Sequence, residues 1–360
     1  MNHDPRHVER FIQSLPAVCD PSQFSHLHLV HWPLDQLPLG PVLSEVGFTG
    51  TLVAARSSTA EMAENMGGFD QVVVHEHPTA GESATDHILM ELPQGREAAR
   101  LAIQEALKAL PSEGALWVFG NKESGIMPLP KRLPGSQSVL SKGHLRLLRI
   151  PATAQWEEPK KRGKAKRAPF DFSTPFHHYQ QGELTLATRP GIFSWQEADL
   201  ASLILLETLA EQPPLTGELL DWGCGAGLIG VTLAKQNAGL QVTMSDDMVR
   251  AVRCSEESAN LNGVAERCEV ILEDGIGEQL SEMTFDHIVT NPPFHRGHSM
   301  DREVAQQFIR DAAAQLVLGG KLWLVANDFL DYGTVLGECF GKVEKWVKRD
   351  NFTVWCAEAV

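Results

Sequence analysis

The stretch that decides the fold is LLDWGCGAG at residues 219–227, followed by LIGVTLAKQ at 228–236. The apolar start of the first segment is typical of a buried strand, and the second segment has the apolar spacing of a helix. Between them, glycines at positions 223, 225 and 227 allow the backbone to come close to a ligand. The spacing G-x-G-x-G differs from the dinucleotide pattern G-x-G-x-x-G, and a glycine turn alone is weak support for a function. The stretch predicts the strand–turn–helix unit of a Rossmann-like α/β domain.

An acidic residue follows the next expected strand. Residues 241–245 have strand character and end at Asp246, which lies 19 residues after Gly227. In nucleotide-binding α/β folds, an acid at this place accepts hydrogen bonds from ribose hydroxyls. The alternative is that Asp246 caps the helix expected to begin near Met248, and Asp247 competes for either role. The register favours Asp246 as the ribose ligand.

A third expected strand, residues 268–272, ends in Glu273-Asp274-Gly275. Asp274 is placed to accept a hydrogen bond from an adenine amino group. The alternative is a simple Asp-Gly turn. Because open α/β sheets bind ligands at the carboxyl ends of their strands, these acids indicate a nucleotide-type site at that edge.

The tetrapeptide Asn291-Pro292-Pro293-Phe294 follows an apolar strand at residues 285–290. Two successive prolines fix φ and remove two backbone donors, which leaves carbonyl groups as acceptors. The Asn291 amide oxygen and the Pro292 carbonyl can accept both hydrogens of a planar amino group, and Phe294 offers a face for base stacking. Ordinary turn chemistry is the alternative. Beside a nucleotide-type site, the tetrapeptide predicts an enzyme that holds an exocyclic amine while its nitrogen is attacked by an electrophile.

The elements after the tetrapeptide alternate between helix and strand and close with two strands. They are expected at residues 302–316 (helix), 321–325 (strand), 334–340 (helix), 343–347 (strand) and 352–357 (strand). A short turn, Arg349-Asp350-Asn351, joins the last two strands. This order predicts an α/β domain with a seven-stranded, mostly parallel sheet that contains one antiparallel strand.

Length and composition indicate two globular domains. The chain has 360 residues, 43% of them hydrophobic, and is too long for most single cores. No apolar run approaches the roughly 20 residues of a membrane span, and the opening residues 1–5 do not resemble a signal peptide. Scattered cysteines indicate reduced thiols in a cytoplasmic protein without a zinc site. The cysteines are Cys19, Cys224, Cys254, Cys268, Cys339 and Cys356.

Asp221 with the glycine turn, Asp246, Asp274 and the tetrapeptide, in that order, resemble the class I S-adenosylmethionine-dependent methyltransferases that act on amino nitrogens. More narrowly, the chain is similar to the bacterial ribosomal RNA guanine-N2 methyltransferases of the RsmC and RlmG types. The segments that carry this narrower similarity are Gly191-Ile192-Phe193-Ser194, Asn291-Pro292-Pro293-Phe294-His295 and Val325-Ala326-Asn327. The similarity is strong over about residues 182–360 and fainter before them, where those enzymes carry a second domain.

The resemblance implies S-adenosylmethionine as the cofactor and a site within the C-terminal half. The implied cofactor-binding residues are Asp221, Gly223, Gly225, Gly227, Asp246, Asp274 and Phe193. Asn291, Pro292 and Phe294 would act on the guanine amine as catalytic residues, and Pro293 would contact the substrate. The catalytic domain is expected to span residues 182–360.

The first 155 residues repeat the C-terminal half in outline. Two pairs of segments match, 86–93 with 286–293 and 114–119 with 320–325. Glu91 stands where the second copy has Asn291, and no G-x-G-x-G occurs before residue 150. Residues 1–155 are therefore predicted to be a degenerate methyltransferase-like domain used for folding support or RNA docking. Chance similarity is the alternative, because the matching segments are short.

Residues 156–181 are predicted to form a basic and aromatic linker. In a chain with a formal net charge of −15, RNA binding must rely on a local patch, and six basic residues here are the candidates for phosphate contacts. They are Lys160, Lys161, Arg162, Lys164, Lys166 and Arg167. A solvated, passive linker is the alternative. His177 and His178 have no third ligand at metal spacing, so no metal is expected.

The sequence therefore predicts methyl transfer to the exocyclic N2 amine of a guanosine in ribosomal RNA, with the 16S rRNA of the small subunit favoured. Four alternatives stay open: guanine-N2 methylation of 23S rRNA, adenine-N6 methylation, methylation of a protein glutamine, and a non-catalytic RNA-binding factor. The expected partner is ribosomal RNA or a ribosomal subunit. A monomer is the default expectation.

Overall fold

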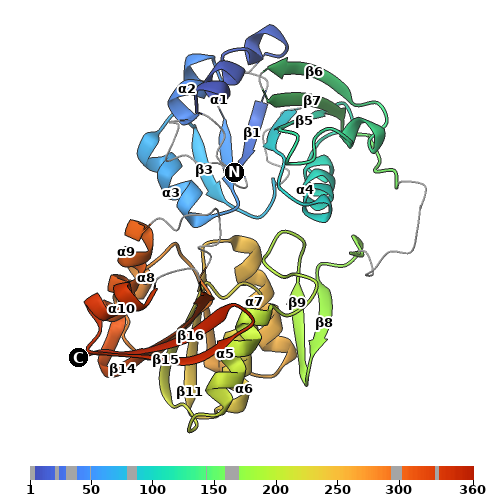
Figure 1. Ribbon diagram of the computed structural model, residues 1–360. Coiled ribbons are helices and arrows are strands. Elements are labelled where there is room, and N and C mark those ends of the chain that lie inside the picture. Colours follow the sequence, from blue (N-terminus) through green and yellow to red (C-terminus); the bar gives the residue numbers. More distant parts are fainter. Residues whose placement is uncertain are drawn as a thin grey trace. The chain divides into compact units, whose positions relative to one another are not determined.

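In the computed structural model the chain forms two compact units, Met1–Thr174 and Pro175–Val360, distinguished by colour in Figure 1. The boundary falls within the segment 156–181 that the sequence suggests as a linker. The structure describes residues 5–20, 24–29, 39–48, 50–78, 87–142, 144–158, 170–292, 302–328 and 332–360. Within these residues no helix is both long and apolar enough to cross a membrane.

The sheet of the second unit has seven strands in the order β12-β11-β10-β13-β14-β16-β15. The strands are β10 (Gly217–Trp222), β11 (Leu240–Asp246), β12 (Cys268–Leu272), β13 (Phe285–Thr290), β14 (Leu316–Asn327), β15 (Lys342–Arg349) and β16 (Phe352–Glu358). The first five pair in parallel, and β16 is antiparallel to both of its neighbours. The predicted seven-stranded sheet with one antiparallel member is confirmed. Asp350 and Asn351 take positive φ values of 54° and 65° in the turn between β15 and β16.

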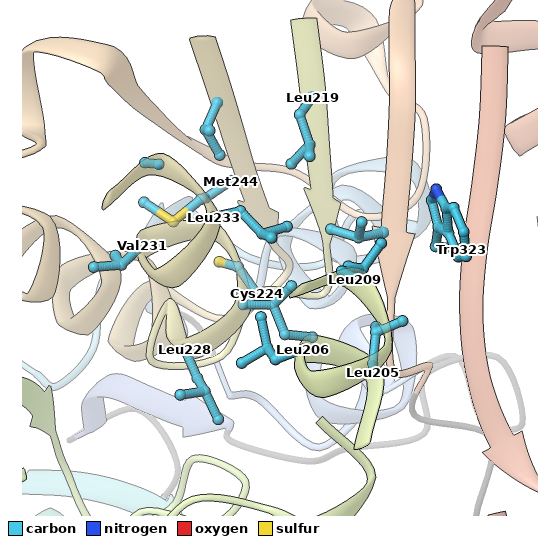
Figure 2. Packing of buried hydrophobic residues seen from close by; sticks show 14 of the residues in the cluster. Leu205, Leu206, Leu209, Leu219, Cys224, Leu228, Val231, Leu233, Met244 and Trp323 are labelled. Atoms are coloured by element: carbon cyan, nitrogen blue, oxygen red, sulfur yellow. The ribbon is translucent and has the colours of Figure 1, made fainter. Parts of the chain in front are cut away.

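Helices cover both faces of this sheet. They are α5 (Leu200–Ala210), α6 (Leu228–Gln236) and α7 (Val249–Leu261) on one face, and α8 (Glu278–Ser281), α9 (Arg302–Gln315) and α10 (Tyr332–Cys339) on the other. Figure 2 shows leucines of α5 and α6 packed beside Leu219, Met244 and Trp323 of the strands. Since strand side chains alternate between faces, Asp221 and Asn291 lie on the face covered by α5 and α6.

The first unit repeats this topology, with the strand order β3-β2-β1-β4-β5-β7-β6. Its elements are α1 (Pro5–Ile12), β1 (Phe24–Leu29), α2 (Leu39–Glu45), β2 (Thr51–Ala54), α3 (Ser57–Met66), β3 (Gln71–Val74), β4 (His87–Glu91), α4 (Arg96–Lys108), β5 (Ala115–Gly120), β6 (Gln137–Lys142) and β7 (Leu145–Pro151). Leu89 pairs with Trp117 as Val289 pairs with Trp323, so buried Glu91 occupies the position of Asn291. The prediction of two tandem Rossmann-like units, the first without the motifs of the second, is confirmed.

The two sheets also share a β-bulge. The register skips Val139 between β6 and β7, and it skips Trp346 between β15 and β16. In each sheet, one residue of the edge strand pairs with the same residue of the antiparallel strand as Trp117 or Trp323 does. The skipped residue lies two positions after that edge-strand residue. A bulge is a specific local feature that related sheets keep. Its recurrence at one position is what duplication of a single domain predicts.

A hairpin that the sequence did not predict precedes the seven-stranded sheet of the second unit. Its strands are β8 (His177–Gln181) and β9 (Leu184–Thr188), and two side chains, one from α7 and one from its C-cap residue, hydrogen-bond to the backbone of β9. Asn262 accepts from the Thr185 N–H at 3.1 Å and donates to the Thr185 carbonyl at 2.8 Å. Ser258 accepts from the Ala187 N–H at 3.0 Å and donates to the Ala187 carbonyl at 3.4 Å. These bonds fix the segment that leads to Phe193.

Candidate active site

The glycine turn lies between β10 and α6 and is held by the end of β11. Gly223, Gly225 and Gly227 have φ values of +79°, +58° and +79°, a region that favours glycine. The Gly223 and Cys224 N–H groups each donate to the Ser245 carbonyl at 2.9 Å. A Cβ added at Gly223 or Gly225 would meet no heavy atom within 4 Å. The turn therefore exposes backbone that a ligand can approach closely.

A buried serine of α7 contacts the glycine turn through its side chain. Ser255 donates to the Gly225 carbonyl at 3.1 Å, and its hydroxyl lies 3.2 Å from the Cys224 sulfur. Burial raises the pKa of the Cys224 thiol, which keeps it protonated and unsuited to nucleophilic attack. Cys224 is thus a structural residue of the turn.

Asp246 connects the end of β11 to the glycine turn and to the start of α7. Its Oδ2 accepts from the Gly225 N–H at 3.0 Å, and its Oδ1 accepts from the Met248 N–H at 2.9 Å. The second contact is to the N–H of Met248, the N-cap residue of α7, so Asp246 lies before the helix and is not its N-cap. A carboxylate has about four acceptor sites, so a ribose ligand is compatible with these two contacts.

Asp221 is buried against α6, with 1% of its surface exposed. Its Oδ2 accepts from the Gly230 N–H in the first turn of the helix at 2.7 Å. Burial raises the pKa of the Asp221 carboxyl to about 7; the Gly230 hydrogen bond opposes this shift, and the charge of Asp246 adds to it. Through this hydrogen bond, Asp221 fixes α6 to β10 and so helps to hold the glycine turn between them.

Asp274 lies exposed beyond the end of β12, before Gly275 with its φ of +64°. Its neighbour Glu273 points elsewhere and accepts from the Gln279 and Leu280 N–H groups at 2.9 and 3.0 Å, which caps α8. Of these two acids, only Asp274 presents an exposed side chain at the carboxyl edge of the sheet.

Asn291 lies directly after β13, and its amide nitrogen is fully engaged by α5. Its Nδ2 donates to Asp199 Oδ2 at 2.8 Å and to Ser202 Oγ at 3.0 Å. Its Oδ1 is buried and has no hydrogen-bond partner within the described residues. Because a buried acceptor without a donor is costly, this atom marks a place where a ligand N–H group fits. Pro292 is buried; Pro293 and Phe294 lie outside the described residues.

Among the residues that the structure describes, Phe193 has a highly exposed aromatic side chain, with 61% of its surface accessible. The adjacent Ile192 packs in a buried cluster with Ala226 of the glycine turn and Met248, which places the Phe193 segment against the turn. Ser194 has a φ of +49°, a backbone conformation uncommon for a residue with a side chain. An exposed ring held at this point can contact a planar ligand.

The order of the strands brings the predicted residues of the second unit to one edge. Asp221 and Asp246 lie at the carboxyl ends of β10 and β11, and Asp274 and Asn291 follow the neighbouring strands β12 and β13. Thr290 donates to the Trp222 carbonyl at 2.9 Å where β13 and β10 end. Within the described ranges, no group of three or more His, Cys, Asp or Glu side chains could hold a metal ion. The predicted phosphate-binding residues lie outside those ranges; they are Lys160, Lys161, Arg162, Lys164, Lys166 and Arg167.

Three residues of this site, Asp199, Ser202 and Ser255, were not anticipated from the sequence. Asp199 directly precedes the apolar run of α5, a pattern that predicts a helix cap, and its side chain accepts from the Ser202 N–H at 3.0 Å. That pattern gives no sign of the contact with Asn291, which depends on the packing of α5 beside β13.

Comparison with known proteins agrees with this geometry. The methyltransferase small domain family matches residues 183–356. The ribosomal RNA small subunit methyltransferase C of Hahella chejuensis is 34% identical over 277 residues, which cover 76% of this chain and 77% of that protein. The enzyme of the same name from Yersinia enterocolitica is 30% identical over 276 residues, covering 76% and 75%.

A solved structure extends the likeness over both units. The 16S rRNA N2 methyltransferase RsmC of T. thermophilus, in complex with AdoMet and guanosine, superimposes with a TM-score of 0.76 and 25% identity, covering 97% of this chain and 91% of that chain. The fold and the site define a class I S-adenosylmethionine-dependent methyltransferase. Within this class, the chain belongs to the ribosomal RNA small subunit methyltransferase C family.

Proposed function

We propose that this enzyme transfers a methyl group from S-adenosylmethionine to the N2 amine of a guanosine in the RNA of the small ribosomal subunit. The observation that carries the proposal is the buried Oδ1 of Asn291, which accepts no hydrogen bond from the described residues. An exocyclic amine supplies the N–H group that this acceptor requires. The ligands in the structure of the T. thermophilus relative, AdoMet and guanosine, support the same pairing of donor and base.

The residues at the edge of the sheet fit the cofactor. The open glycine turn suits a ligand that approaches the backbone, Asp246 suits the ribose hydroxyls, and exposed Asp274 suits the adenine amine. Asp221 would act through the turn that it stabilises, and Phe193 would lie against the bound cofactor. S-adenosylmethionine, when bound, supplies an electrophilic methyl group on a sulfonium.

The side chain of Asn291 and the Pro292 carbonyl would prepare the amine for methylation. The lone pair of a guanine amine is delocalised into the ring. Two acceptors on its hydrogens favour a pyramidal nitrogen and stabilise the positive charge that develops there. The methylated amine is then acidic enough to lose its proton to water or to the carbonyl. Alignment in the site supplies much of the rate, with Phe294 stacking on the base and Pro293 in contact with it.

RNA contacts are proposed for the six basic residues at 160–167 and for the first unit, which would serve in folding support or docking. Described residues on both sides of that segment contact one helix of the first unit. Glu158 pairs with Arg96 and Arg100 of α4, and the Phe172 ring lies 3.9 Å from the Arg100 guanidinium. The described residues that flank this stretch of sequence therefore contact the same helix, α4. A monomeric, cytoplasmic enzyme is the accompanying expectation.

A methyl-transfer assay separates this function from its rivals. Tritiated S-adenosylmethionine would be supplied with small subunits, large subunits, free ribosomal RNA and total protein, and the labelled RNA digested to nucleosides. We expect label in N2-methylguanosine from the small subunit or its RNA. Label in the large subunit, in N6-methyladenosine or in protein glutamine would favour the corresponding alternative. Absence of label from every substrate, with RNA binding intact, would favour a non-catalytic factor.

A further inference from the structure

The amide of Asn291 is held in one of two nearly isosteric orientations. Rotation by half a turn about its last side-chain bond would exchange Nδ2 and Oδ1 with little change in shape. In the structure, Nδ2 faces the Asp199 carboxylate at 2.8 Å and the Ser202 hydroxyl at 3.0 Å. A carboxylate only accepts hydrogen bonds, so the exchanged orientation would place two acceptors against each other. Asp199 therefore dictates that Oδ1 faces away from α5.

The residues that impose this orientation are themselves fixed. Asp199 is the N-cap of α5, where it accepts from the Ser202 N–H at 3.0 Å and from the Ser202 hydroxyl at 3.4 Å. The Ser202 hydroxyl thus donates to Asp199 and accepts from Asn291. Ser202 is buried, with 7% of its surface exposed. The negative charge of Asp199 lies at the start of α5, where the helix dipole stabilises it. The three side chains are joined by hydrogen bonds, and among the described residues the buried Asn291 Oδ1 has no donor.

We propose that Asp199 and Ser202 are positioning residues that lock Asn291 as an acceptor and select a substrate that presents N–H. This inference rests on the proposed function, because it assigns the free oxygen to the target amine. The negative charge of Asp199 also polarises the Asn291 amide, since hydrogen bonds in a chain strengthen one another. As positive charge develops on the amine, that polarisation strengthens the bond from the amine to Oδ1.

Two substitutions separate orientation from helix capping. Asp199→Asn keeps a cap and a side chain of the same length but removes the charge. Asp199→Ser keeps a good cap but is too short to reach Asn291. We expect kcat to fall about 10-fold in the first and about 100-fold in the second, since small misplacements at a reacting centre cost about this much. The affinity for S-adenosylhomocysteine and the Tm should stay near the wild-type values in both.

A double-mutant cycle with Asn291→Ala links the loss to Asn291. Asp199→Ser should cause no further loss of kcat in the Asn291→Ala background, measured in single turnovers. An equal loss in both backgrounds, or wild-type kcat in Asp199→Ser, would overturn the positioning role. If Asn291→Ala itself keeps wild-type kcat, the proposed role of Asn291 fails instead.

A readout independent of turnover is the ¹⁵N-labelled side-chain amide signal of Asn291, assigned by its loss in Asn291→Ala. The signal should shift in both Asp199 variants, because each alters the hydrogen bond to Nδ2. An unchanged signal in Asp199→Ser would show that Asp199 does not hold the amide.

Discussion

The carboxylate of Asp221 accepts a hydrogen bond of 2.7 Å from the backbone N–H of Gly230, which joins the central strand β10 to the first turn of α6. The glycine turn lies between the two joined elements, so its shape depends on this bond. The resemblance to the methyltransferases assigns Asp221 to the cofactor site, yet this contact is with the backbone of the protein itself. Its burial has a consequence for stability.

Folding stability should depend on the ionisation of Asp221. Burial raises its pKa to about 7, above the value of about 3.9 in an unfolded chain. Between these values the folded state holds a proton that the unfolded state has released, so stability falls as pH rises and levels off above about pH 7. Asp221→Asn keeps an acceptor for Gly230 but cannot ionise. Between pH 5 and pH 8, the free energy of unfolding measured in urea should fall by roughly 1–3 kcal/mol less in the variant than in the wild type. An equal fall in both proteins would contradict this assignment.

Gly230 should tolerate no larger side chain. A Cβ there would lie 2.7 Å from the Met244 side chain and 3.0 Å from Asp221 Oδ2. Gly230→Ala should lower the free energy of unfolding by about 1–3 kcal/mol through overpacking and weaken cofactor binding through the turn. The matched control is Gly337→Ala in α10, where a Cβ would meet no heavy atom within 4 Å. It should be neutral or stabilising by up to about 1 kcal/mol, because alanine favours helix. Similar losses in both variants would contradict the packing argument.

Loss of the Asn291 side chain should separate chemistry from cofactor binding. Asn291→Ala removes the proposed acceptor for the target amine, so turnover should fall by about 100-fold or more. The affinity for S-adenosylhomocysteine, measured by equilibrium dialysis, should stay within a few-fold, because the proposed cofactor contacts follow other strands. Equal loss of both quantities would count against the assigned role.

Neutralising the basic segment should reduce the salt dependence of RNA binding. Each phosphate contact contributes a slope of about −0.7 to −0.9 in log K against log salt. Lys160→Ala combined with Lys161→Ala should therefore flatten the slope by up to about 1.4–1.8 in filter binding to ribosomal RNA at several KCl concentrations. Lys108→Ala is the control, since this exposed lysine of α4 already pairs with Glu105 at 2.8 Å. A double variant that keeps the wild-type slope, or changes it no more than Lys108→Ala does, would favour a passive linker.

The sequence predicts the strands of the second unit's sheet well, because their apolar runs are bounded by residues that favour turns. The strands β12 and β13 begin and end where the sequence places them, at residues 268–272 and 285–290. The hairpin β8–β9 was missed because its first strand is the polar segment HHYQQ. Its second strand is hydrogen-bonded by Ser258 of α7 and by Asn262, the C-cap residue of that helix, and both are distant in sequence.

The same limit applies to the site. The glycine turn and the residues after each strand are local patterns, which sequence reasoning can find. The hydrogen bond between Asn291 and Asp199 joins residues 92 positions apart. It exists only because β13 lies inside the sheet next to β10 while α5 packs across that face. The bulge at Trp346 likewise depends on strand pairing and not on a local motif.

The most direct test of the account is a crystal structure of the enzyme with S-adenosylhomocysteine and guanosine. We expect the cofactor over the turn at residues 223–227 and the guanine N2 within about 3 Å of Asn291 Oδ1, a hydrogen-bond distance. A cofactor bound away from that turn, or a guanine whose N2 faces a group other than Asn291, would contradict it.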